Sequence, residues 1–118
     1  MKAPRPSPET PVVVGKAYDF CLWMIQKVEN FPRSFRFSVG DRLVATALDI
    51  QLRLVDAAYA RHKAPILTEV NGMLNRLRYL VRIAKDLKLF SIDAYGHAAE
   101  RIDEIGRMTG GWQKATAE

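Results

Sequence analysis

A row of polar and cationic residues follows one predicted helix in the second half of the chain. The row consists of Asn71, Asn75, Arg78, Arg82 and Lys85. At about 100° per residue these positions fall within a sector of roughly 80° on one side of a helix. Guanidinium and ammonium groups in such a row favour an anionic partner, and the planar fork of arginine suits phosphate and carboxylate groups. An ordinary solvated helix face has the same pattern, and periodicity alone does not separate the two interpretations.

The sequence holds little that is typical of an enzyme. Motifs of zinc hydrolases, dithiol redox proteins, nucleotide-binding loops and serine hydrolases are absent. The histidines, His62 and His97, lie far apart in the sequence, and neither has the Glu-x-x-His spacing of di-iron bundles. We therefore expect no metal site, no cofactor and no catalytic residue.

Composition supports a partner with negative charge. The 118 residues carry 18 Lys and Arg against 13 Asp and Glu, which gives a formal net charge of +5. This balance favours nucleic acid, acidic proteins or anionic membrane surfaces. The single cysteine, Cys21, lies in an apolar segment and is expected to pack rather than react. Without a membrane-spanning run or a signal peptide, the sequence predicts a soluble, cytoplasmic protein.

Four segments have the three-and-four spacing of apolar residues that is typical of amphipathic helices. The predicted helices cover about residues 12–30, 39–61, 66–87 and 92–109. Short connections between long helices predict an all-α fold, an antiparallel up-down-up-down four-helix bundle. The bundle is expected over 12–114, after a flexible Pro-rich arm at 1–11 and before a frayed tail at 115–118.

Several residues predict where these helices begin and end. Ser38 is expected to cap the second helix, with Asp41 at the third helical position. Pro65 suits the first turn of the third helix. Ser91 is expected to cap the fourth helix. The pair Gly110–Gly111 is expected to end that helix in a left-handed conformation.

The second helix and its neighbourhood carry further expectations. That helix has more apolar residues than one buried stripe needs, which indicates a subunit interface beside the core. Asp49 and Arg53 are spaced for an ion pair within it. The connection 31–38 alternates aromatic residues with arginines, and we favour capping of the core over stacking on unpaired bases. In the fourth helix, Gly96 and Gly106 are expected to let a neighbouring helix approach closely.

Several short segments together resemble a known family. They are Tyr18–Asp19, Leu22–Met24, Val28–Ser34, Arg36–Phe37, Gly40–Leu43, Ala47–Asp49, Leu77–Arg78, Leu80–Leu87, Ile102–Arg107 and Gly110–Trp112. In this order they are similar to the accessory variability determinants of diversity-generating retroelements and to the bundles called 23S rRNA intervening sequence proteins. The resemblance covers about residues 15–114.

The resemblance implies a function that composition and periodicity do not. Proteins of this kind are basic, barrel-shaped homopentamers of four-helix bundles. They bind the reverse transcriptase of the element and nucleic acid, RNA and also DNA, and mutagenic copying requires them, although they are not catalysts. The matching basic positions here are Arg78, Arg82 and Lys85, beside Asn75, with Arg76 and Arg33 as weaker candidates.

Two other functions remain open from the residues alone. One is a protein-binding adaptor whose cationic face meets an acidic partner without binding nucleic acid. The other is a structural homo-oligomer with no ligand. The leading hypothesis is an accessory scaffold for mutagenic reverse transcription.

Overall fold

The computed structural model describes residues 11–116, and the four predicted helices all occur in it. Within this range the chain forms no strand. The elements are α1 (Val12–Glu29), α2 (Arg33–Phe35), a π-helical turn η1 (Arg36–Gly40), α3 (Asp41–Tyr59), α4 (Ala64–Asp86) and α5 (Ile92–Thr116). The all-α class and the four-helix bundle are therefore confirmed. The predicted arm, apart from Pro11, and the last two residues of the predicted tail lie outside the described range.

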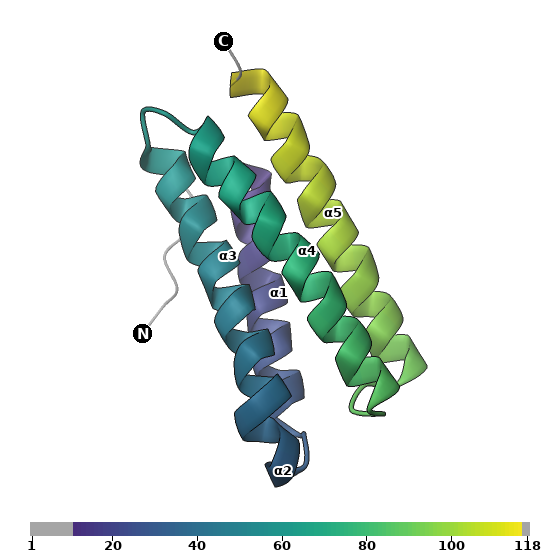
Figure 1. Ribbon diagram of the computed structural model, residues 1–118. Coiled ribbons are helices and arrows are strands. Elements are labelled where there is room, and N and C mark those ends of the chain that lie inside the picture. The colour runs from purple at the N-terminus through teal and green to yellow at the C-terminus, as the bar shows by residue number, and fades with distance from the viewer. Residues whose placement is uncertain (1–10, 117–118) are drawn as a thin grey trace.

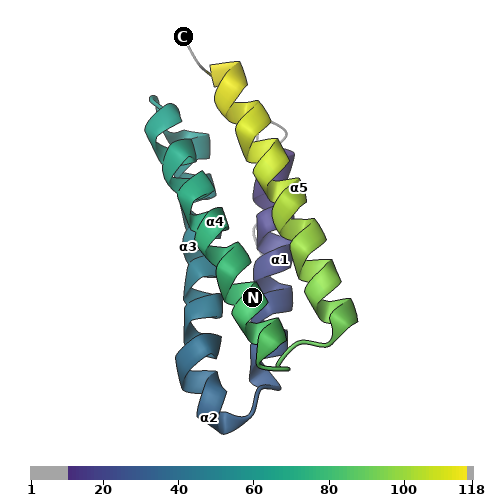
Figure 2. The same ribbon diagram turned by 45° about the vertical axis from the view of Figure 1, so that its right-hand side comes forward.

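The four long helices lie side by side around one core. Helix α1 packs on α3 and α5, and α4 packs on the same two helices. In Figure 1, the connections after α1, α3 and α4 lie at alternate ends of the bundle. Figure 2, turned by 45°, shows α4 between α3 and α5 again. Helices α4 and α5 therefore lie against each other along a long seam.

The core is built from the apolar stripe of each helix. In α4 the buried residues recur at three- and four-residue spacing, and they are Leu67, Val70, Leu74, Leu77, Val81 and Ala84. At the end of the bundle where α1 ends and α5 begins, Trp23 stacks on Phe20 and contacts Phe90, while Phe31 meets Phe90 edge to face at 5.5 Å. Cys21 is buried, and burial raises the pKa of its thiol. This position suits packing rather than reaction, as predicted.

The segment between α1 and α3 differs from the prediction. The chain becomes helical again at Arg33 and passes through η1 directly into α3, so the expected loop to Ser38 is wrong. Ser38 does not cap α3, because its Oγ lies 3.5 and 3.4 Å from the carbonyl oxygens of Ser34 and Phe35. A Cβ at Gly40 would lie 2.7 Å from Cγ1 of Val28. Close packing against α1 therefore requires glycine where η1 joins α3.

The aromatic residues of this segment divide into buried and exposed ones. Phe31 is buried in the core, whereas Phe37 is 67% exposed. The guanidinium of Arg36 donates to the Phe31 carbonyl oxygen. Capping of the core is therefore confirmed for Phe31 and is wrong for Phe37.

The ends of α4 and α5 follow the prediction only in part. Pro65 lies in the first turn of α4, and Ser91 caps α5 by accepting a hydrogen bond from the Ala94 amide at 3.0 Å. The end predicted at Gly110–Gly111 is wrong, since α5 continues to Thr116 and neither glycine has a positive φ. Lys88, in the turn before α5, has the left-handed conformation, with φ of 61°. Within the added turns of α5, Gln113 forms hydrogen bonds with Asn71 and Thr68 of α4.

Helix α3 exposes the apolar surplus that its sequence predicted. Leu52 is 58% and Tyr59 is 84% exposed, and Leu48 is exposed beside them. The predicted ion pair of Asp49 with Arg53 is wrong, because Arg53 contacts Asp56 and Glu69 instead. Among residues 11–116, no helix is long and apolar enough to cross a bilayer.

Candidate nucleic-acid interface

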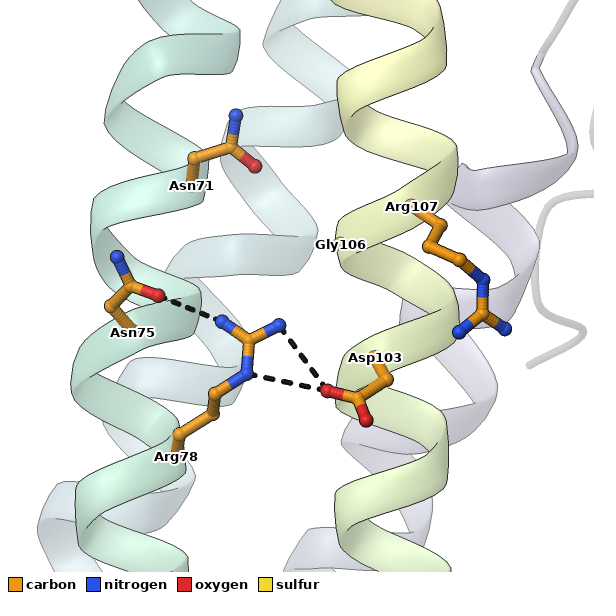
Figure 3. A pocket seen from close by; sticks show the side chains of 6 residues that line it. All are labelled: Asn71, Asn75, Arg78, Asp103, Gly106 and Arg107. Atoms are coloured by element: carbon orange, nitrogen blue, oxygen red, sulfur yellow. Dashed lines mark hydrogen bonds and ion pairs between the residues drawn. The ribbon is translucent and has the colours of Figure 1, made fainter.

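A hollow of about 450 Å³ lies on the seam between α4 and α5. We call it the α4–α5 groove. Its lining combines polar groups with apolar carbon atoms and is contributed by both helices (Figure 3). The lining residues are Asn71, Asn75 and Arg78 of α4 with Asp103, Gly106 and Arg107 of α5. Three of the five residues of the predicted row therefore meet in one place.

Arg78 is the central side chain of the groove. Its Nη1 donates to Oδ1 of Asn75 at 2.7 Å, and its Nε and Nη2 both lie 3.4 Å from Oδ1 of Asp103. The side chains of Arg78 and Asp103 remain 41% and 58% exposed. In Figure 3 the edge formed by Nη1 and Nη2 faces the opening between Asn71 and Gly106. A guanidinium held at its flanks, with its terminal edge open, is suited to accept an anion.

Gly106 keeps the opening beside Arg78 clear. A Cβ at this position would lie 3.1 Å from Nη2 of Arg78 and 4.0 Å from Cδ1 of Leu74. The expected close approach is therefore confirmed for Gly106, where a side chain of α4 makes it. It is wrong for Gly96, around which a Cβ would meet nothing within 4 Å.

The comparison with protein families decides which group this bundle belongs to. A family model described as bAvd-like matches residues 11–116, which is nearly the whole chain. The chain belongs to the bAvd-like family. None of the curated proteins compared with it matches. The resemblance to accessory variability determinants is thus confirmed, and the bAvd-like family is of an accessory, non-catalytic type.

In this bAvd-like bundle, Asn71 and Lys85 of the row also contact side chains of α5. Asn71 donates from Nδ2 to Oε1 of Gln113 at 3.0 Å, and Gln113 in turn donates to Oγ1 of Thr68. The ammonium of Lys85 lies 4.8 Å from the ring centre of Tyr95, within the range of a cation–π contact. Asn71 and Lys85 thus each contact α5 side chains at a different level of the seam.

Arg82 continues the row toward the C-terminal end of α4. Its side chain is 67% exposed, and its Nε lies 4.0 Å from Oδ2 of Asp86 one helical turn later. An exposed ion pair at this distance holds a side chain only weakly. Arg82 is therefore free to turn toward a ligand next to the groove.

The two weaker candidates are not brought into the groove. Arg76 is exposed, but it lies about 200° around α4 from Arg78, on the opposite flank of the helix. Arg33 begins α2, outside the set of residues that line the groove. The sequence grouped both with the row only by charge and resemblance.

Sequence reasoning missed the contribution of α5. Asp103 lies on the surface of α5, and its contact with Arg78 depends on the register of the two helices. Arg107 lines the groove with its stem, and Figure 3 shows its guanidinium pointing away from Arg78. The spacing of Asp103, Gly106 and Arg107 at three and four residues indicates one shared face. That signal was available, but nothing in the sequence said which helix it faces.

The chemistry of the groove is recognition of charge and of hydrogen-bond acceptors. Its polar groups are the guanidinium of Arg78, two amides and a carboxylate. Within residues 11–116, no three His, Cys, Asp or Glu side chains gather closely enough to hold a metal ion. These groups can donate hydrogen bonds to an anion and accept them from a ligand.

Proposed function

We propose that this antiparallel four-helix bundle is an accessory protein of a diversity-generating retroelement. In this role it binds the element's reverse transcriptase together with template RNA or DNA, and so supports mutagenic reverse transcription. The observation that carries the nucleic-acid part is the open guanidinium edge of Arg78 in the α4–α5 groove. Membership of the bAvd-like family supports the accessory role.

The cationic row provides the expected contact with phosphate. Arg78, Arg82 and Lys85 follow one edge of α4 over about two turns, a rise of roughly 10 Å. Asn75 orients the Arg78 guanidinium. Arg76 and Arg33 lie elsewhere on the surface and serve, in this proposal, as peripheral contacts that add attraction at a distance.

Self-association of the bundle brings together the cationic residues of several subunits. The exposed apolar side chains of α3, among them Leu48, Leu52 and Tyr59, support a second contact surface on the side of α3 that faces away from the core. Leu22 and Tyr18 of α1 are exposed as well. We propose a homo-oligomer, five copies by the family resemblance, that repeats the α4–α5 groove in each subunit.

Light scattering and RNA titration test this function together. We expect a solution mass of several subunits, five if the resemblance holds. We also expect tight binding of a single-stranded RNA at about 50 mM salt and much weaker binding at about 200 mM, because phosphate contacts release counterions. A monomer without RNA affinity would contradict the proposal.

A protein-binding adaptor with a cationic face is the second candidate. The acidic partner of such an adaptor would bind the same arginines through its carboxylate groups, without any phosphate. Co-purification with the reverse transcriptase, before and after nuclease treatment, separates the two. The adaptor is favoured if the protein still captures the reverse transcriptase after nuclease treatment and does not itself bind RNA or DNA.

A further inference from the structure

We propose that the α4–α5 groove holds a single phosphate group at one fixed position, on the Nη1–Nη2 edge of Arg78 beside Gly106. This inference rests on the proposed nucleic-acid function, and it adds a defined site to what would otherwise be diffuse attraction. The occupant is a phosphate of a nucleic-acid backbone.

The first argument is the orientation of Arg78. A free surface arginine samples many rotamers, and ordering it on binding costs conformational entropy. Here Asn75 holds Nη1 at 2.7 Å, while Asp103 lies 3.4 Å from Nε and Nη2. Each terminal nitrogen carries two hydrogens and uses one of them in these contacts. The other two are left for a bidentate contact with two phosphate oxygens.

The second argument is the space in front of this edge. At Gly106 the backbone of α5 comes close to the Arg78 guanidinium, since a Cβ there would lie 3.1 Å from Nη2. In Figure 3 no side chain drawn there fills the opening above the guanidinium. Any larger residue at position 106 would occupy the place of the phosphate.

Asp103 has a specific consequence for selectivity. Its carboxylate lies on one flank of Arg78 and offsets part of the positive charge, so that the groove does not attract every anion. The contact of 3.4 Å is longer than an optimal charge-assisted hydrogen bond. A phosphate can therefore bind the Nη1–Nη2 edge of Arg78 while the carboxylate of Asp103 stays beside Nε and Nη2. Asp103 is thus a positioning residue.

The test changes no charge. Gly106→Ala places a methyl group in the proposed phosphate position, and Gly96→Ala in the same helix is the matched control because a Cβ there meets nothing within 4 Å. Both substitutions favour helix formation, so both variants are expected to fold. A small shift of the Arg78 side chain accommodates the new methyl group.

Binding of a fluorescein-labelled oligouridine, followed by anisotropy, gives the readout. We expect Gly106→Ala to weaken binding about tenfold at low salt, as for the loss of one charge-assisted contact. The slope of log affinity against log salt should fall by about 0.7, the equivalent of one phosphate on a single strand. Gly96→Ala should match the wild type in both quantities. Equal affinity and slope for Gly106→Ala and the wild type would overturn the fixed site.

A second probe keeps the site testable if the wild type does not bind RNA, a result that would contradict the proposed function itself. Inorganic pyrophosphate is then titrated into labelled protein while the amide signals of Asn75 and Gly106 are followed by NMR. Saturable shifts in the wild type and in Gly96→Ala, and their loss in Gly106→Ala, support a phosphate site. Absence of shifts in the wild type overturns it.

Discussion

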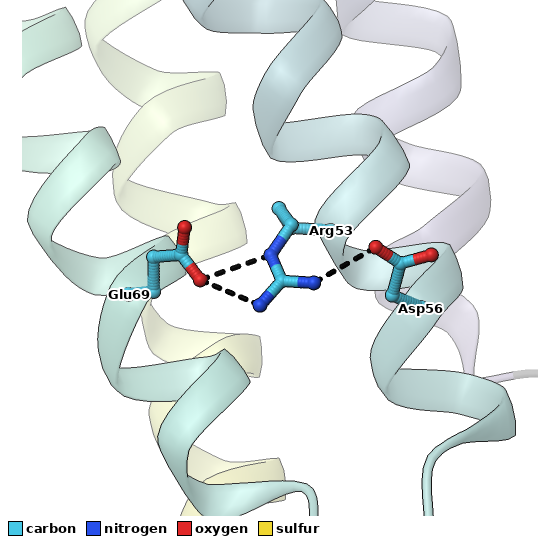
Figure 4. A network of polar contacts seen from close by, with 3 residues as sticks. All are labelled: Arg53, Asp56 and Glu69. Carbon is cyan, nitrogen blue, oxygen red and sulfur yellow. Dashed lines mark hydrogen bonds and ion pairs between the residues drawn. The ribbon is translucent and has the colours of Figure 1, made fainter.

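Two arginines bridge neighbouring helices in this bundle, and they do so in opposite ways. Arg53 of α3 reaches across to α4, where its Nη2 and Nε lie 2.6 and 2.9 Å from Oε2 of Glu69 (Figure 4). Its Nη1 also donates to Oδ2 of Asp56 at 2.9 Å. Arg78 of α4 reaches toward α5 and meets one carboxylate oxygen at 3.4 Å. One guanidinium is held by two carboxylates, and the other keeps an open edge.

This difference separates a structural contact from a binding site. The hydrogen bonds to Glu69 and then to Asp56 raise the pKa of Arg53 above its ordinary value, so Arg53 stays charged throughout the pH range in which proteins fold. Two carboxylates also leave Arg53 with no net attraction for a further anion. Arg78 has an amide on one flank and a single, more distant carboxylate on the other, so N–H groups on its terminal edge remain for a ligand.

The largest effect is expected when Arg78 and the neighbouring Arg82 are removed. Arg78→Ala with Arg82→Ala should weaken binding of oligouridine at low salt by more than about tenfold, because two phosphate contacts are lost. The matched control removes two arginines of α3, Arg42→Ala with Arg53→Ala, and should have a much smaller effect. Anisotropy titrations of the two variants side by side measure the difference, with circular dichroism to confirm the helical fold. Equal losses in both would mean that net charge, rather than the groove, determines affinity.

A charge-preserving substitution sharpens the comparison further. Arg78→Lys keeps the positive charge but loses the planar fork, so binding should fall severalfold, to a level between the wild type and Arg78→Ala. Arg53→Lys should leave RNA affinity unchanged. The same titration applies. If Arg78→Lys binds like the wild type, a point charge is sufficient and the fork has no role.

A buried hydroxyl in α5 gives a prediction about stability rather than binding. Thr109 is fully buried and its Oγ1 has no hydrogen-bond partner. Thr109→Val should raise the free energy of unfolding by about 1 kcal/mol, since an unpaired polar group is removed from the core. Urea denaturation measures this change, and RNA affinity should stay the same because Thr109 does not line the groove. A loss of stability would indicate that the hydroxyl has a partner in solution.

The smallest effect is expected at the ion pair of Arg53 with Glu69. Glu69→Gln removes one carboxylate from Arg53 and should lower the melting temperature slightly at low salt. High salt should erase the difference between the variant and the wild type, because exposed ion pairs are screened. A fall in melting temperature that is independent of salt would point to a packing role of Glu69 instead.

The sequence predicted the parts of the fold that depend on local chemistry. Apolar spacing located all four helices, and Pro65 and Ser91 marked two helix starts correctly. The π-helical turn before α3 was not predictable, because it follows from the close contact of Gly40 with Val28 on another helix. The end of α5 was missed for a similar reason. Contacts of Trp112 and Gln113 with the rest of the bundle outweigh the tendency of two glycines to end a helix.

The candidate site was predictable on one helix only. The spacing of Asn75, Arg78 and Arg82 is a property of α4 alone, and the structure keeps these residues on one edge. Whether Asp103 and Gly106 meet Arg78 depends on how α5 is rotated and shifted along α4. Many side chains of the core determine that register together, so hydrophobic periodicity does not reveal it.

A single NMR titration tests the contrast between the two arginines most directly. Oligouridine is added to isotopically labelled protein, and the Nε–Hε signals of Arg78 and Arg53 are followed in the same spectra. We expect the Arg78 signal to shift and saturate with RNA while the Arg53 signal stays in place. A shift of the Arg53 signal without one at Arg78, or equal shifts of both, would contradict the assignment of the α4–α5 groove as the nucleic-acid site.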